Sequence, residues 1–236
     1  KCPGDPQWFS QNTMRDLITN KLNAFLVENS YGKASIIGTV TPWIDLPASV
    51  CQPPSGIPLL TPNDAIAAAD STVDFSHYDA VIAFIPNMFP TGTLGPIPVQ
   101  TNDGLIPLKV MSQTSNLFSA YSPVAILAHE FGHTFGFGHA DGMTCQAPLG
   151  AVGIDACTLL PNYGDPFDTM GGAFNSTKSS PHYSARFKAE AGWLTPTKLP
   201  QNPTGYFTIS PQETGKNSLL EIPYDNSLQH HPHVFP

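Results

Sequence analysis

One short stretch, Ala128–Ala140 (AHEFGHTFGFGHA), combines residue types whose spacing suits metal binding. On a helix, His129 and His133 lie one turn apart, so both imidazoles leave the same face. Two neutral imidazole nitrogens at this spacing can bind one tetrahedral Zn²⁺. Glu130 stands beside the first histidine and can reach the same region without binding the metal. The spacing therefore predicts a zinc site with a carboxylate next to it.

A third ligand is expected just beyond the end of this helix. Gly136 suits a left-handed turn at the helix C-terminus, and that turn would bring back His139. Three protein ligands leave the fourth position for water, as in catalytic zinc sites. We expect Glu130 to take the proton of that water as it attacks a carbonyl. The alternative is an ordinary helix whose histidines are half-buried packing residues, which the complete motif disfavours.

The flanking sequence predicts the elements that position this stretch. Ser122 can cap a helix that begins at Pro123, where the missing N–H costs nothing, and runs through Phe135. Buried strands are expected at 79–85 and 107–112 from their apolar, β-branched content. Further expected elements are helices over 11–28, 63–70 (capped by Asn63) and 184–192, strands over 35–40, 205–210 and 218–223, an edge strand near 97–100 and an irregular stretch over 141–172.

Composition excludes several classes of protein. The chain of 236 residues has a net charge of −8 and only 10 Lys+Arg. It therefore lacks the positive charge with which nucleic-acid-binding proteins contact phosphates. It holds no apolar run long enough to span a membrane. Hydrophobic residues make up 41% and charged residues 12%, whereas disordered chains are poor in the first and rich in the second. We therefore expect a folded chain that binds no nucleic acid.

The four cysteines lack the paired Cys-x-x-Cys spacing of a structural zinc site. An even count fits two disulfides in an oxidising compartment, and three pairings are possible. We favour Cys2–Cys51 and Cys145–Cys157, with buried free thiols as the alternative.

The stretch HEFGHTFGFGH (129–139) resembles the zinc-binding motif of the metzincin proteases, His-Glu-x-x-His-x-x-Gly-x-x-His. Metzincins also carry a methionine in a tight turn beneath the metal, and the resemblance assigns that role to Met170 in DTMGG (168–172). The chain is most similar to the gametolysin-like secreted peptidases. The stretches that carry this likeness are SYGKASIIGTVTPWIDLP (30–47), YDAVIAFIPN (78–87), YGDPFDTMGG (163–172) and AGWLTPTKL…GYFTISPQETG (191–215).

The resemblance implies an α+β zincin fold: a twisted mixed sheet behind the active-site helix, an irregular lower subdomain and a short C-terminal β-rich extension. We expect a catalytic domain over 1–194, divided into 1–139 and 140–194, and an accessory segment over 195–236. Truncation of that segment is left open. Several metzincins carry a tyrosine two residues after the methionine, where this chain has Gly172. Tyr163 and Tyr183 are candidates to take the place of that tyrosine.

The resemblance further implies a secreted, zinc-dependent endopeptidase that acts on extracellular proteins. We expect a monomer that binds its polypeptide substrate in extended form, paired with an edge strand near residues 95–103. Asp141, Asp155 and Asp168 are candidates to orient the ligand histidines. Two alternatives remain. One is a catalytically silent zinc module for adhesion or binding, and the other is a zinc hydrolase of a non-peptide amide or ester.

Overall fold

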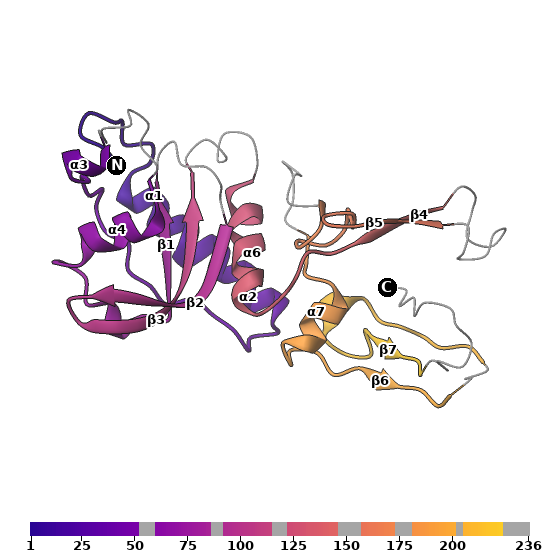
Figure 1. Ribbon diagram of the computed structural model, residues 1–236. Coiled ribbons are helices and arrows are strands. Elements are labelled where there is room, and N and C mark those ends of the chain that lie inside the picture. Colours follow the sequence, from indigo (N-terminus) through magenta and orange to yellow (C-terminus); the bar gives the residue numbers. More distant parts are fainter. Residues whose placement is uncertain are drawn as a thin grey trace. The chain divides into compact units, whose positions relative to one another are not determined.

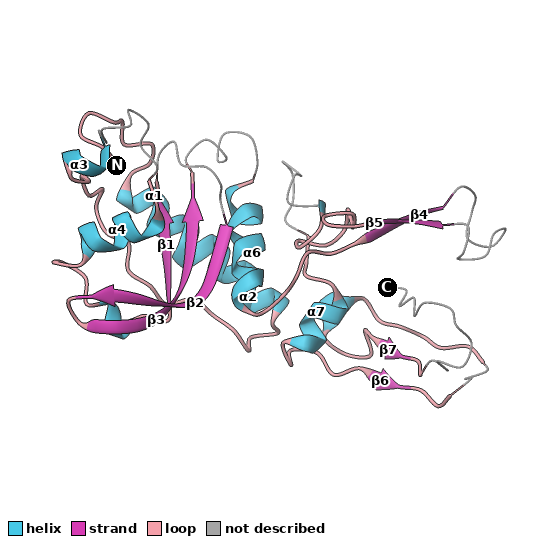
Figure 2. Cartoon of the chain, in the orientation of Figure 1, coloured by secondary structure: helices cyan, strands magenta, loops and turns pink. Residues whose placement is uncertain are grey.

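The computed structural model describes residues 1–51, 60–85, 92–114, 122–145, 157–172, 181–201 and 205–223 (Figure 1). Its architecture mixes helices with a twisted mixed sheet (Figure 2), so the predicted α+β class is confirmed at this level. The chain forms two compact units. The first contains the described residues between 1 and 22 and between 37 and 138; the second contains those of 23–36, 139–172 and 181–223. The domain boundaries expected from the sequence stay a prediction.

The first unit is built on a three-stranded sheet of order β1-β3-β2. β1 (Ala80–Phe84) runs parallel to β3 (Gly104–Gln113), and β2 (Gly92–Thr101) runs antiparallel to β3. All three strands were predicted, but β2 and β3 are both longer than expected. The prolines that obscured β2 in the sequence are tolerated because it is an edge strand, and its pairing is interrupted between Leu94 and Ile97.

One face of this sheet is covered by α4 (Pro62–Ala69). Side chains of α4, β2 and β3 form a buried apolar cluster made of Ile66, Ala69, Phe75, Val99, Leu108 and Val110. Phe75 begins the short 3-10 helix η2 (Phe75–His77). The predicted cap of α4 is wrong. Thr61 is the N-cap and forms a reciprocal capping box with Asp64, whereas Asn63 lies inside the helix.

The other face of the sheet is occupied by α6 (Pro123–Thr134), which packs on β2. Successive strand residues point to opposite faces, so Lys109 points away from the α4 cluster, and its Nζ donates to the carbonyl of Thr134 at 2.8 Å. Ser122 occupies the N-cap position as predicted, but its side chain makes no capping hydrogen bond within the described chain. The helix ends before Gly136, whose φ of +89° confirms the predicted left-handed turn.

The predicted helix over 11–28 is helical throughout but not uniform. It consists of α1 (Gln11–Arg15), the π-helix η1 (Asp16–Leu22) and α2 (Asn23–Asn29). Leu17 and Leu22 are both buried although they lie five positions apart. Five positions separate hydrogen-bonded partners in a π-helix, so the wider turn brings both leucines to one face. Apolar spacing alone did not reveal this change of helix type.

Both favoured disulfides, Cys2–Cys51 and Cys145–Cys157, are present. Cys51 ends the short helix α3 (Ala48–Cys51), so the first bridge ties the N-terminal residues to this helix. The strand expected over 35–40 is wrong. This stretch is irregular, and its backbone is held by side chains: Asn23 accepts from the N–H of Ile36, and Gln11 donates to the carbonyl of Val40.

The second unit contains the hairpin of β4 (Gly142–Cys145) and β5 (Cys157–Leu160), joined by the second disulfide. The expectation of an irregular stretch over 141–172 is therefore wrong for these strands. α7 (Ala185–Glu190), capped by Ser184, confirms the short helix expected there. β6 (Thr197–Lys198) pairs in parallel with β7 (Leu220–Glu221), and the 3-10 helix η5 (Gln212–Thr214) precedes β7. The strand expected over 205–210 is wrong, since that stretch is irregular and exposes its apolar residues.

No helix among the described residues is long and apolar enough to cross a membrane.

A fully buried lysine lies in the second unit. The Nζ of Lys188 is 3.0 Å from Nδ1 of His182 and 5.0 Å from the ring centroid of Tyr31. Because an ammonium can only donate, Nδ1 of His182 accepts and its Nε2 carries the proton toward Oε1 of Glu28, 3.3 Å away. Burial lowers the pKa of Lys188 from 10.5 to about 8, and the carboxylates of Glu213, Glu28 and Asp168 offset part of this shift.

This lysine predicts a stability that rises in alkaline solution. The folded-state pKa of Lys188 lies below its unfolded value, so between about pH 8 and pH 10.5 the unfolded chain binds more protons. The contribution to stability is fully present above pH 10.5 and is lost as the pH falls through 8. Lys188→Met should remove this dependence, measured by urea unfolding across that range. Lys216→Met, at an exposed site, should retain it; equal pH slopes for wild type and Lys188→Met would contradict the assignment.

Candidate metal centre

Helix α6 carries the first two histidines of the predicted site on one face. The ring centroids of His129 and His133 are 4.9 Å apart, with their planes nearly perpendicular at 89°. His129 and the neighbouring Glu130 are buried, with 5% and 6% of their surfaces exposed. The middle of the helix therefore places one imidazole and one carboxyl group in surroundings largely shielded from water, whereas His133 is partly exposed.

The orientation of His133 is set by the turn that ends its own helix. Its Nδ1 lies 2.8 Å from the carbonyl oxygen of Phe137. A carbonyl can only accept, so Nδ1 carries the hydrogen and the lone pair remains on Nε2. Such a hydrogen bond from the second ring nitrogen is the usual support of a metal-binding histidine. The sequence offers three aspartates as candidates for this role, but it does not single out a backbone carbonyl, because every residue has one.

The turn at Gly136 brings His139 to the pair. One candidate ligand atom from each of His129, His133 and His139 lies within 4.8 Å of the others. Three neutral imidazole nitrogens suit Zn²⁺, and they also suit copper, nickel and iron. The donor set therefore fits a metal ion, including the expected zinc, without selecting one metal.

The segment after His139 is bonded to the predicted methionine turn. The N–H of Ala140 donates to the carbonyl of Met170 at 2.8 Å, and the Met170 side chain is fully buried. Asp168 closes the turn by accepting from the N–H of Met170 at 2.7 Å and from that of Ser184 at 3.0 Å. Burial raises the pKa of Asp168. The carbonyl of Met170 is thus hydrogen-bonded to the residue that follows His139, while the supporting role of Met170 stays a prediction.

Three backbone segments meet closely behind His139, and glycines permit the contact. A Cβ on Gly142 would lie 2.1 Å from the carbonyl oxygen of Gly164. A Cβ on Gly164 would lie 2.6 Å from the nitrogen of Gly142, and one on Gly171 would lie 2.1 Å from the carbonyl oxygen of Asp165. All three distances are far below van der Waals contact. Segments 139–142, 160–165 and 170–172 therefore depend on these three glycines to lie against one another.

The two candidate tyrosines have different surroundings. Tyr183 is fully buried, and burial raises its pKa well above the usual value. Tyr163 is 40% exposed, and its ring centroid is 3.9 Å from that of His139. A Cβ on Gly172 would lie 2.9 Å from the carbonyl oxygen of Tyr163, so the segment that carries Tyr163 crowds the place of a side chain at 172. No sequence spacing indicated the contact between Tyr163 and His139.

Two of the three aspartates proposed to orient the histidines accept hydrogen bonds from backbone N–H groups elsewhere. Asp141 accepts from the N–H of Asn162 at 2.7 Å, and Asp168 closes the methionine turn. Asp155 lies outside the described residues.

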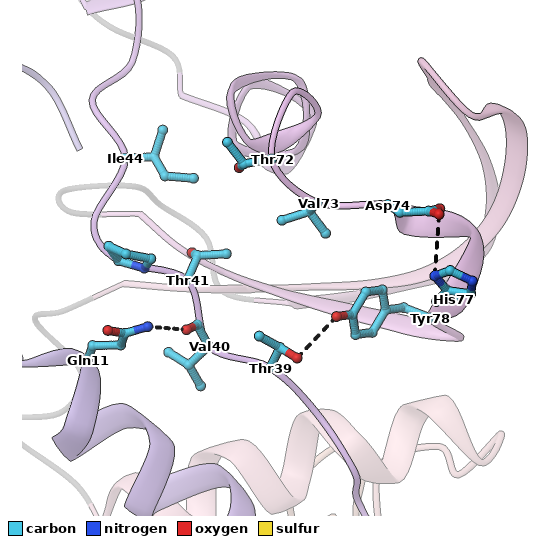
Figure 3. A pocket seen from close by; sticks show the side chains of 11 residues that line it. Gln11, Thr39, Val40, Thr41, Ile44, Thr72, Val73, Asp74, His77 and Tyr78 are labelled. Atoms are coloured by element: carbon cyan, nitrogen blue, oxygen red, sulfur yellow. Dashed lines mark hydrogen bonds and ion pairs between the residues drawn. The ribbon is translucent and has the colours of Figure 1, made fainter.

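The first unit also contains a pocket, whose lining residues differ from those of the histidine cluster (Figure 3). Gln11, Thr39 and Tyr78 are among its lining residues, and Tyr78 donates to the hydroxyl of Thr39 at 3.1 Å. Asp74 and His77 also line it, and Oδ2 of Asp74 lies 3.3 Å from Nδ1 of His77. None of the three clustered histidines lines this pocket.

Comparison of the chain with protein families, with curated proteins and with solved structures found no match. The family resemblance of the motif is therefore an argument from the residues of this chain alone.

Proposed function

We propose that this protein is a zinc-dependent endopeptidase of the metzincin type. The observation that supports the proposal most directly is the clustering of His129, His133 and His139 beside the buried Glu130. A purely structural zinc site has no use for a carboxyl group next to its first ligand, and it usually has four protein ligands. Here the described cluster supplies three, which suits a site that also receives a reactant.

The roles follow from the chemistry of each group. His129, His133 and His139 would hold the metal, and a bound zinc would polarise a peptide carbonyl and acidify water. Glu130 would accept the proton of the attacking water and pass it to the leaving amine. His133 keeps its proton on Nδ1, against the carbonyl of Phe137, so Nε2 stays available throughout. Met170 would pack beneath the ligands as a soft, polarisable side chain.

The sheet of the first unit supports an extended polypeptide as the substrate. β2 is an edge strand, paired with β3 on one side within the described residues, and α6 packs on it. An edge strand offers backbone groups to which an extended chain can add by strand pairing. We propose that residues 95–101 of β2 bind the substrate in this way.

Extracellular proteins are the proposed substrates. The two disulfides are consistent with an extracellular protein, since such bridges persist in oxidising compartments. Secretion and the substrate class rest otherwise on the resemblance to gametolysin-like peptidases.

Metal removal tests the proposal. The purified protein should cleave an unfolded protein, lose this activity after dialysis against a chelator, and recover it when about one equivalent of zinc is returned. The measurement is the initial rate of peptide-bond cleavage together with zinc content. His77→Ala, at an exposed histidine, should behave as wild type, and His139→Ala should lose activity and bind zinc more weakly, through the two remaining histidines.

Zinc binding without cleavage by wild type would reject the endopeptidase assignment. Hydrolysis of small amides or esters under the same conditions would then identify a non-peptide hydrolase, and inactivity toward both would identify a binding module. Cleavage that survives complete metal removal would reject a zinc mechanism of any kind.

A further inference from the structure

The segment Leu160–Asp165, here called the strap, lies against the third histidine and carries a tyrosine. The ring centroid of Tyr163 is 3.9 Å from that of His139, and the two planes are tilted by 35°. The centroids of aromatic pairs in proteins usually lie 4.5–7 Å apart, so this is close packing. The ring of Tyr163 therefore covers a large part of one face of the imidazole.

Two residues of the strap adopt a backbone conformation that residues other than glycine rarely adopt. Asn162 and Tyr163 have φ values of +51° and +61°, in the left-handed region. Asparagine visits this region readily, but a bulky tyrosine does so uncommonly. Such conformations persist where surrounding contacts determine them, and they cluster at functional sites.

Surrounding contacts do determine the strap. The N–H of Asn162 donates to Asp141 at 2.7 Å, and the N–H of Asp165 donates to the carbonyl of Ala140 at 3.2 Å. Both acceptors lie within two residues of His139. On the opposite side, the N–H of Gly172 donates to the carbonyl of Asp165 at 2.7 Å. The strap is thus bonded both to the segment that follows the third histidine and to the methionine turn.

We propose that Tyr163 is a positioning residue for the third metal ligand. Its ring restricts rotation of the His139 imidazole, so that one ring nitrogen faces the ligand nitrogens of His129 and His133. The other two histidines need no such help, because they project from one helix and His133 is also held by a carbonyl. His139 stands outside the helix, and the strap replaces that support. This inference rests on the proposed metal site, and it concerns the aromatic ring, not the hydroxyl group.

Zinc affinity of tyrosine variants tests the proposal. Tyr163→Asn removes the ring with a residue that tolerates the positive φ, whereas Tyr163→Phe keeps the ring and removes the hydroxyl. Competition with a chromophoric chelator should show zinc binding weakened about tenfold for Tyr163→Asn, the size typical of lost support to a ligand. Tyr163→Phe should stay within about twofold of wild type, as should Tyr206→Asn at a fully exposed tyrosine.

The same substitution in the His139→Ala variant tests whether Tyr163 acts through His139. If Tyr163 acts through His139, Tyr163→Asn should change zinc affinity tenfold in wild type and not at all in His139→Ala. The visible spectrum of the cobalt-loaded protein should change for Tyr163→Asn and stay unchanged for Tyr163→Phe. Equal affinities of Tyr163→Asn and wild type, or equal losses for Asn and Phe, would overturn the proposal.

The same measurements separate this inference from the proposed function. A wild-type protein that binds zinc and cleaves peptides, with Tyr163→Asn unaltered in affinity, rejects the positioning role alone. A wild-type protein that binds no zinc rejects the metal site, and the positioning role with it.

Discussion

Replacement of Glu130 by glutamine is expected to lower kcat/KM for peptide cleavage by about 10³-fold and to leave zinc content unchanged. Glutamine preserves the shape of this buried side chain but cannot accept the proton of an attacking water. General bases contribute roughly 10²–10⁴-fold to such reactions. The loss should appear in kcat, because proton transfer occurs in the chemical step and not in substrate binding. Initial rates on an unfolded protein and metal analysis of the same samples provide the measurement.

The matched control is Glu190→Gln, at an exposed glutamate paired with Arg186, which should retain full activity and metal content. A rate for Glu130→Gln near that of wild type would show that another group accepts the proton. Loss of zinc along with activity would instead show that Glu130 supports the ligands, and the assignment as a base would fall.

Replacement of Gly164 by alanine is expected to lower the free energy of unfolding by about 3 kcal/mol, at the upper end of what overpacking usually costs. The added methyl would lie 2.1 Å from the carbonyl oxygen of Leu160 and 2.6 Å from the nitrogen of Gly142. Both neighbours are backbone atoms, so no side-chain rotation can relieve the overlap, and the strap must move away from β4. Urea denaturation of the zinc-free protein measures the effect.

Gly38→Ala is the control, because a Cβ there meets no atom within 4 Å. It should change stability by less than about 0.5 kcal/mol, as surface substitutions usually do. A wild-type unfolding midpoint for Gly164→Ala would show that segments 139–142 and 160–165 are not packed as described.

The sequence predicts the parts of the fold that depend on neighbours along the chain. Pro123 and Gly136 bracket α6. Both disulfide pairings that the sequence favours are also present. The three histidines came together as expected because four positions on a helix and one glycine turn fix their separation. The clustering of the three histidines was therefore predictable before any tertiary contact was known.

The errors arise where distant segments decide the outcome. The apolar residues of 35–40 favour a strand, yet Asn23 and Gln11 hold that backbone instead. The hairpin of β4 and β5 escaped prediction because each strand has only four residues and gains its partner through a disulfide. The contact of Tyr163 with His139 joins residues 24 positions apart through glycines whose role appears only in three dimensions.

The hydrogen bond between His133 and Phe137 also bears on how the site assembles. His129, His133 and the carbonyl that orients His133 lie within nine consecutive residues, so closing this half of the candidate centre costs little chain entropy. Contacts of such low contact order form early in folding. His139 gains its support later, when the strap and the methionine turn reach it from farther along the chain. We expect a folding chain to bind metal weakly through His129 and His133 first, and more tightly once His139 has reached its position.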